Sequence, residues 1–299
     1  MYVDYLAPTT IEEAVGALAS TSDSRVFAGA TDLIPQIRSG RPEPSLLVDL
    51  KRIDRLTAVT EGDTSWTIGA AAPTSSLTED AAFSRQFPGL SEAAGLIGSD
   101  QIQNRSSLGG NLCNASPAAD SVPAMVVNQA RAIIASVDGT RTITVDQVAT
   151  APGRTSLEPG EFIVEFEVDK PPARTGDAYL RMTPRTEMDI AVVGAGARIT
   201  LDADGNCTEA RIALGAVAPT VRRVAEAEAA LVGHPITDDT LAAVAAAASA
   251  ACEPIDDKRG TIAYRKQVAG VLAKRAVKLA AERAAGSGTN NAATENGSH

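Results

Sequence analysis

The chain has 299 residues, 44% of them apolar and only 3% aromatic, and its formal net charge is −10. This apolar content is enough for cores of aliphatic side chains, so the bulk of the chain is not expected to be disordered. An acidic chain is poorly suited to nonspecific binding of nucleic acid or anionic lipid, so we expect neither as a partner.

The first 55 residues predict a small βαβ unit, with buried strands at 25–28 and 46–50. Between them, the turn Ala28-Gly29-Ala30-Thr31-Asp32 leads into an apolar-periodic run, which predicts a helix beginning near Asp32. Backbone N–H groups at such a turn can receive phosphate oxygens, and the Thr31 hydroxyl can add a further donor. The alternative is an ordinary turn whose small residues only allow the strand and the helix to pack.

Residues 56–172 change in character and predict a second lobe of the α+β class. Helical patterns at 77–83 and 90–97 precede a glycine-rich segment. Farther along, Asp138-Gly139 predicts the turn of a hairpin between two β-like runs, and a third run follows at 162–168.

The most distinctive segment is Gly109-Gly110-Asn111-Leu112-Cys113-Asn114-Ala115-Ser116-Pro117-Ala118-Ala119-Asp120. Two consecutive glycines omit both Cβ atoms and permit φ > 0, so backbone N–H groups can approach a ligand closely. This loop and the earlier turn lie roughly eighty residues apart and could hold one extended dinucleotide from two sides. The alternative is a glycine-rich surface turn followed by an Asn cap.

Residues 173–285 predict a C-terminal α+β domain, with strands at 191–201 and 211–217 followed by Ala-rich helices. The helices are expected at about 222–232, 238–251 and 261–285. Residues 170–176 have the composition of a linker, and the Gly, Ser, Asn and Thr-rich segment 286–299 predicts a disordered tail.

The chain offers little for metal or nucleophilic chemistry. Cys113, Cys207 and Cys252 are far apart, so we expect reduced thiols in a cytoplasmic protein, with neither a disulfide framework nor a metal site. Of the two histidines, His299 is terminal and His234 precedes a proline in a turn-like segment. No run of about 18 apolar residues and no signal-peptide pattern occurs, so no stable membrane insertion is expected.

Together these segments resemble the FAD-binding subunits of the molybdenum hydroxylases, the group that contains xanthine dehydrogenase and aerobic carbon monoxide dehydrogenase. The strongest likeness is Gln101-Ile102-Gln103-Asn104-Arg105-Ser106-Ser107-Leu108 leading into the glycine pair. The family carries an Ala-Gly-Gly-Thr-Asp type of sequence at the first loop, where this chain has Ala30 in place of the second glycine. An alanine is tolerable there unless the residue needs φ > 0.

The resemblance implies an α+β fold, with a two-lobed FAD domain of the vanillyl-alcohol-oxidase-like type and a C-terminal domain of antiparallel sheet and helices. It also implies two sets of FAD-binding residues, which are Ala28, Gly29, Ala30, Thr31 and Asp32 in the first loop and Ser107, Gly109, Gly110, Asn111 and Asn114 in the second. The first loop would lie on the pyrophosphate, and Ser107, Gly110 and Asn111 would face the diphosphate or the adjoining ribityl chain. The alternative for Asp32 is a helix cap.

Four more residues take roles by the same resemblance. Asp120 would accept hydrogen bonds from sugar hydroxyls, and Phe162 or Ile163 would pack on the flavin ring. Arg181 would lie near the pyrimidine side of the flavin and stabilise the N1 negative charge of its reduced form. The alternative for Arg181 is an ordinary surface cation.

The function implied is that of an electron-transfer flavoprotein subunit. It would pass electrons to an external acceptor from the [2Fe-2S] clusters of a small partner subunit, while a large partner subunit carries the molybdenum cofactor. A dimer of such heterotrimers is expected, and no catalytic residue is expected in this chain. Both loops depart from the pattern of the carbon monoxide dehydrogenases, and neither substrate nor acceptor is specified. The alternatives are a stand-alone FAD-dependent oxidase and a non-enzymatic nucleotide-binding scaffold.

Overall fold

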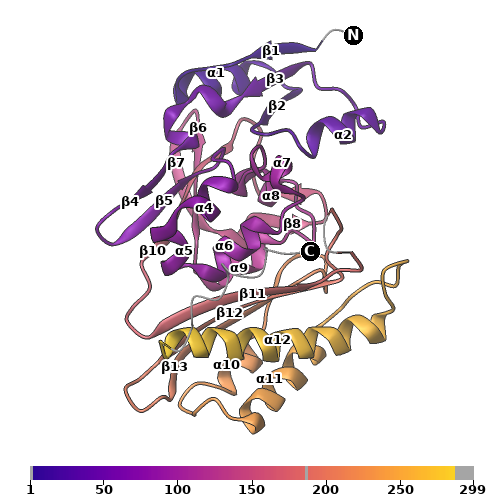
Figure 1. The fold of residues 1–299 in the computed structure, drawn as a ribbon. Helices are drawn as coiled ribbons and strands as arrows, with labels where there is room; N and C mark the ends of the chain where they lie inside the picture. Colours follow the sequence, from indigo (N-terminus) through magenta and orange to yellow (C-terminus); the bar gives the residue numbers. More distant parts are fainter. Residues whose placement is uncertain (1–2, 186–187, 287–299) are drawn as a thin grey trace, which may run out of the picture.

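The structure is a computed structural model that describes residues 3–185 and 188–286. Its parts follow one another along the molecule, from the N-terminal lobe at the top of Figure 1 to the C-terminal helices at the bottom. Apart from Gly286, the tail expected to be disordered lies outside the described residues.

The N-terminal lobe is built on a three-stranded parallel sheet of order β1-β3-β2, which confirms the expected βαβ unit. Thr10 caps its first helix, since the Thr10 hydroxyl accepts a hydrogen bond from the Glu13 N–H at 3.1 Å. The elements are β1 (Asp4–Leu6), α1 (Ile11–Ser20), β2 (Ser24–Phe27), α2 (Leu33–Arg38), β3 (Leu46–Asp49) and α3 (Asp54–Thr57).

The middle lobe contains a five-stranded antiparallel sheet of order β4-β5-β10-β6-β7. The predicted hairpin between β6 and β7 is present, with its turn at residues 137–138 and Gly139, at φ of +120°, as the first residue of β7. The strands are β4 (Val59–Glu61), β5 (Ser65–Gly69), β6 (Arg131–Ser136), β7 (Gly139–Thr144) and β10 (Phe162–Asp169), with β8 (Ala149–Ala151) and β9 (Arg154–Thr155) pairing separately.

Six short helices follow β5, and all but the fourth of them (α7) contribute side chains to a core that contains Trp66, Phe83, Phe87 and neighbouring aliphatic residues. They are α4 (Ser75–Glu79), α5 (Ala81–Gln86), α6 (Pro88–Gly95), α7 (Asp100–Gln103), α8 (Leu108–Cys113) and α9 (Ser121–Val127). Helix α8 occupies the segment that we expected to be a loop.

The C-terminal part is a four-stranded antiparallel sheet of order β11-β12-β13-β14, with α12 lying along it in Figure 1. Its elements are β11 (Thr175–Met182), β12 (Val193–Leu201), β13 (Cys207–Gly215), β14 (Arg222–Arg223), α10 (Ala225–Ala229), α11 (Asp238–Ala250) and α12 (Ile262–Ala284). The sequence did not predict β11, and the expected linker overlaps its first residues.

The two faces of this sheet have different partners. Aliphatic side chains such as Ala197 and Ile199 join the core formed with α12. On the opposite face, glycines let α9 come close, since a Cβ at Gly196 would lie 3.0 Å from the carbonyl oxygen of Pro123. The C-terminal sheet is therefore packed between its own helices and the middle lobe.

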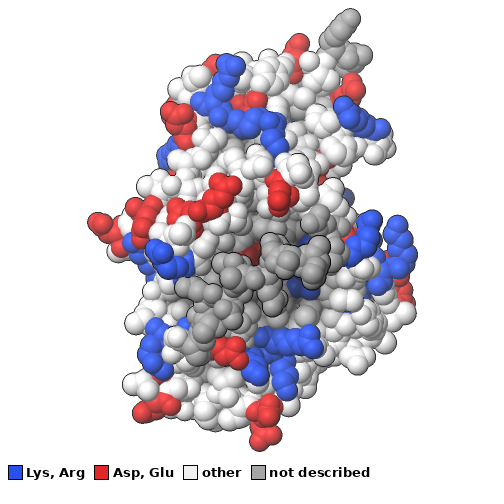
Figure 2. All heavy atoms as spheres, in the orientation of Figure 1, with Lys and Arg blue, Asp and Glu red and all other residues white. Residues whose placement is uncertain are grey.

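Charged side chains of both signs are interspersed over the face of the molecule shown in Figure 2. Within residues 3–185 and 188–286, no helix is long and apolar enough to cross a membrane. In the same residues, no group of three or more His, Cys, Asp or Glu side chains is placed to hold a metal ion.

A substitution at the contact between α6 and β11 provides a test of this packing. A Cβ at Gly89 would lie 2.6 Å from the backbone nitrogen of Ala178, so we expect Gly89→Ala to lower the free energy of unfolding by about 1–3 kcal/mol. The matched control is Gly16→Ala in α1, where nothing lies within 4 Å of the added Cβ. That variant should be unchanged or up to about 1 kcal/mol more stable in urea unfolding. Equal losses in the two variants would contradict the packing.

Candidate functional site

A cavity of about 690 Å³ lies between the N-terminal and middle lobes. This size is typical of sites for small molecules and cofactors. The structure brings both predicted segments to its wall, with Ala28, Gly29, Ala30, Thr31 and Asp32 on one side and Ser107, Gly110, Asn111 and Asn114 on the other.

The first loop is held against the middle lobe by a contact that excludes any side chain. A Cβ at Gly29 would lie only 1.7 Å from the carbonyl oxygen of Arg105. The next residue, Ala30, has φ of +58°, a left-handed conformation that costs a non-glycine residue about 1–2 kcal/mol. The alanine that replaces the family's glycine is therefore strained.

The turn leaves a run of backbone donors without protein partners. The N–H groups of residues 29–32 donate to no described residue. Asp32 stands directly before α2, but its side chain makes no capping hydrogen bond, so the interpretation as a cap is wrong. A left-handed residue within such a run gives the concave arrangement of N–H groups that binds anions.

Lys51 fixes the strand end that carries this loop. Its Nζ donates to the carbonyl oxygen of Ala28 at 2.8 Å and to Oδ1 of Asp49 at 2.5 Å, and it lies 4.5 Å from the ring centroid of Phe27. Burial alone would raise the pKa of Asp49, but hydrogen bonds from Lys51 and Tyr5 lower it below its usual value. Asp49 is therefore an ionised partner for Lys51.

The second segment is the first turn of α8. Ser107 caps it, with the Ser107 hydroxyl accepting from the Gly110 N–H at 3.1 Å. A Cβ at Gly109 would lie 2.4 Å from the carbonyl oxygen of Ala70, so Gly109 serves packing and does not line the cavity. A Cβ at Gly110 would meet only the Ser107 hydroxyl, at 3.3 Å, and would otherwise point into open space.

The helical structure of α8 corrects the loop that we expected in this segment. It also limits which of its backbone N–H groups can bind a ligand. The N–H of Gly109 donates to Ala70 at 3.1 Å, and that of Asn111 donates to the carbonyl oxygen of Ser107 at 2.9 Å. These amides are already used within the protein. The free backbone donors therefore lie mainly on the first loop, while the second segment offers space and side chains.

Several wall residues were not predicted. Gln36 joins the lobes by donating from Nε2 to Oδ1 of Asn114 at 2.8 Å. Arg25 and Arg41 also line the cavity, and burial together with the charge of Arg25 lowers the pKa of Arg41. Single arginines on a lobe surface carry no motif, so no sequence signal could have identified them.

Cys113 is the exposed member of the three free cysteines, and its side chain forms part of the cavity wall. Desolvation by the surrounding protein raises the pKa of this thiol above its ordinary value. Cys207 and Cys252 are buried.

Two predicted residues lie in the core. Phe162 and Ile163 are 1% and 3% exposed, and their side chains belong to two separate apolar cores. Neither forms part of the cavity wall. The expectation that one of them packs on a bound ring does not fit this cavity, because alternate residues of β10 point into the two cores.

Asp120 and Arg181 form a buried ion pair away from the cavity wall. Arg181 Nη1 donates to Asp120 Oδ2 at 2.7 Å, and the Tyr179 hydroxyl donates to Asp120 Oδ1 at 2.8 Å. The Arg181 side chain is only 6% exposed, so its interpretation as a surface cation is wrong. Burial raises the pKa of Asp120, although Arg181 and Tyr179 act against that rise.

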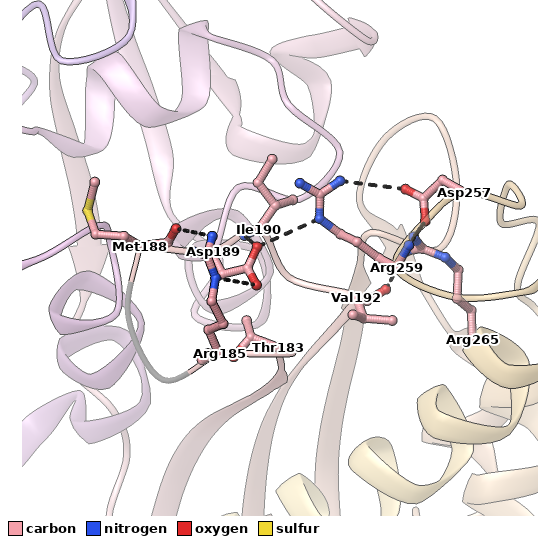
Figure 3. Close-up of polar contacts among 9 residues, drawn as sticks. All are labelled: Thr183, Arg185, Met188, Asp189, Ile190, Val192, Asp257, Arg259 and Arg265. Atoms are coloured by element: carbon pink, nitrogen blue, oxygen red, sulfur yellow. Dashed lines mark hydrogen bonds and ion pairs between the residues drawn. The ribbon is translucent and has the colours of Figure 1, made fainter.

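A loop after β11 also approaches the cavity. The Met188 N–H donates to the carbonyl oxygen of Gly98 at 3.4 Å, beside the wall residue Ile97. Figure 3 shows Asp189 between two arginines, Arg185 at 3.5 Å and Arg259 at 3.8 Å. Asp189 therefore pairs with Arg185 within the loop, and Arg259 ties the loop to the segment before α12.

Substitutions at the neighbouring positions 29 and 30 should have different effects on the free energy of unfolding. Gly29→Ala places a Cβ on a backbone carbonyl, so we expect the free energy of unfolding to fall by at least about 2 kcal/mol. Ala30→Gly removes a left-handed alanine and should be neutral or up to about 1 kcal/mol more stable. Urea unfolding of both variants checks this, and comparable losses would contradict the geometry of the loop.

Comparison with known families divides the chain in two. Residues 1–171 match the model described as "FAD binding domain in molybdopterin dehydrogenase". Residues 178–280 match "CO dehydrogenase flavoprotein C-terminal domain". The two matches together cover most of the chain, and the first covers more than half of it.

Individual proteins are similar over nearly the whole length. The 6-hydroxypseudooxynicotine dehydrogenase complex subunit alpha of Paenarthrobacter nicotinovorans is 33% identical, covering 94% of this chain and 95% of that protein. The xanthine dehydrogenase FAD-binding subunit of Escherichia coli O157:H7 is 30% identical, covering 95% and 98%. A solved carbon monoxide dehydrogenase from Hydrogenophaga pseudoflava, lacking the Mo-pyranopterin moiety of its molybdenum cofactor, has a chain with TM-score 0.90 and 33% identity, covering 95% and 98%.

Proposed function

Since the chain belongs to the FAD-binding medium subunits of the xanthine dehydrogenase and carbon monoxide dehydrogenase family, we propose that it binds one FAD in the cavity between its two lobes. Bound there, FAD would accept electrons and pass them to an external acceptor. The role proposed for this chain is to hold and orient that cofactor within a molybdenum hydroxylase.

The observation that carries the proposal is the set of free N–H groups on the first loop, facing a cavity across from Gly110. We assign the pyrophosphate to the amides of residues 29–32, because anions suit an arrangement of unpartnered backbone donors. Arg25 and Arg41, on the same wall, add positive charge. Gly110 leaves the space that the cofactor needs, and Asn111 and Asn114 supply amide side chains.

Arg181 is proposed to act on the flavin only as part of its ion pair. Asp120 neutralises most of the guanidinium charge, because the two groups are 2.7 Å apart and both are buried. The effect of Arg181 on the flavin potential should then be smaller than that of a lone cation. The proposed contact of Asp120 with sugar hydroxyls would require its carboxylate to share the hydrogen bonds that it now receives.

We further propose two partner subunits, a large one with the molybdenum cofactor and a small one with [2Fe-2S] clusters, in a dimer of heterotrimers. Relatives named as a medium chain and as a complex subunit support this assembly. The unpaired cysteines suit the cytoplasmic location that we propose.

Flavin analysis of the purified chain tests the assignment. Acid release should yield one FAD per chain, and Gly110→Val should abolish its retention, because the branched side chain would occupy the cavity. The variant should still fold, since only the Ser107 hydroxyl lies near the new Cβ. Bound FAD should also slow maleimide modification of Cys113 in the wild type. Released FMN, or full FAD occupancy in Gly110→Val, would place the cofactor elsewhere.

Purification from the native host tests the complex. A tagged chain should bring down molybdenum and iron with two further polypeptides, whereas the chain expressed alone should show no substrate-dependent reduction of its flavin. Elemental analysis and anaerobic visible spectra give the two readouts. Rapid flavin reduction by an organic substrate in the isolated chain would instead indicate a stand-alone FAD-dependent oxidase.

A further inference from the structure

Alternate residues of β11 present polar side chains to the FAD-binding lobes. Asp177, Tyr179 and Arg181 lie two residues apart and so share one face of the strand. Asp177 accepts hydrogen bonds from the N–H groups of Gly89 and Leu90 at the start of α6, at 3.0 and 3.2 Å. Tyr179 and Arg181 donate to Asp120, directly before α9.

Both oxygens of Asp120 are thereby fixed. The Tyr179 side chain is 2% exposed, and its hydroxyl fits only because residue 194 is a glycine, where a Cβ would lie 2.4 Å from that oxygen. A buried carboxylate with one partner on each oxygen has little freedom to rotate. The position of Asp120 is therefore set by the C-terminal sheet.

The residue after Asp120 continues the path to the cavity. Ser121 is fully buried, and its hydroxyl donates to Oδ1 of Asn111 at 2.7 Å. Asn111 lies in α8 and lines the cavity wall. The described residues of that wall all come from positions 18–161, so the C-terminal sheet reaches the cavity only through such intermediate contacts.

The hydrogen bond from Ser121 decides which end of the Asn111 amide is available to a ligand. Because Oδ1 accepts from Ser121, the donor Nδ2 is left, and it makes no hydrogen bond to a described residue. A phosphate oxygen can accept from Nδ2 but would be repelled by Oδ1. If Ser121 were displaced, the amide could turn and offer the wrong group.

We propose that Tyr179 is a positioning residue for FAD, acting through Asp120 and Ser121 to hold the Asn111 amide with Nδ2 toward the cofactor. This inference rests on the proposed binding of FAD in the cavity. It gives the C-terminal domain an indirect part in cofactor affinity, since that domain contributes no residue to the described wall.

The test measures the dissociation constant of the full-length apoprotein for FAD by flavin fluorescence. Tyr179→Phe removes one hydroxyl and keeps the ring, so we expect FAD to bind about five-fold more weakly, as for one lost hydrogen bond. Ser121→Ala should weaken binding by a similar factor, and it provides the same test if Tyr179→Phe does not fold. Asn111→Ala should weaken binding by about ten-fold.

The decisive variant is the double substitution Tyr179→Phe with Asn111→Ala. If Tyr179 acts through the Asn111 amide, the double variant should bind FAD as Asn111→Ala alone does. The inference would be overturned if the two single losses of affinity multiplied in the double variant. It would also be overturned if the dissociation constant were unchanged in both Tyr179→Phe and Ser121→Ala.

Asn128→Ala is the matched structural control. Asn128 Nδ2 donates to Asp177 Oδ2 at 2.7 Å at the same interface, but outside the path to Asn111. This variant should lose thermal stability and keep FAD affinity within about two-fold. If Asn128→Ala lost as much FAD affinity as Tyr179→Phe, the effect of Tyr179 would come from a general loss of packing at this interface. That result would overturn its positioning role. If the wild type binds no FAD, the proposed function itself fails, whereas wild-type binding with an unaffected Tyr179→Phe overturns only this inference.

Discussion

The cavity depends on the approach of one backbone to another at Gly29. With a Cβ position 1.7 Å from the carbonyl oxygen of Arg105, this residue can carry no side chain while the two lobes stay in contact. The chain then has to turn sharply, and Ala30 adopts a left-handed conformation that an alanine disfavours. Strain of this kind persists where surrounding contacts over-determine the backbone. Its consequence is useful, because the turn lies on the cavity wall and its N–H groups donate to no described residue.

The two glycines of α8 satisfy different physical demands. Gly109 lets the helix touch the backbone at Ala70, while Gly110 keeps the cavity open. Each glycine within a helix costs about 0.5–1 kcal/mol relative to alanine. The helix is only six residues long and begins with a Ser107 cap, so tertiary packing carries more of its stability than local preference.

Local signals identified the elements that have a clear turn or a helical periodicity in their sequence. The hairpin at Asp138-Gly139 was predicted from its turn, and the helix expected at 261–285 is observed at Ile262–Ala284. The two loops were recognised from their small residues, whereas the identity of the cofactor followed from resemblance. Strand β11 was missed because its polar residues find their partners across the interface between domains, which no local pattern reveals. The separate roles of Gly109 and Gly110 likewise depend on what lies opposite each Cβ.

The buried ion pair of Arg181 and Asp120 is better explained by orientation than by stability. Removing two charges from water costs about as much as their attraction returns, and well-packed apolar side chains are often as stable. The polar side chains of β11, however, meet their partners in only one register of this strand against the FAD-binding lobes. A slip of β11 by one residue would turn Asp177, Tyr179 and Arg181 away from the FAD-binding lobes. A slip by two residues would remove the Asp177 carboxylate from the start of α6, where it accepts two N–H groups. The alternation of these side chains along β11 therefore specifies how the C-terminal domain sits on the lobes that form the cavity.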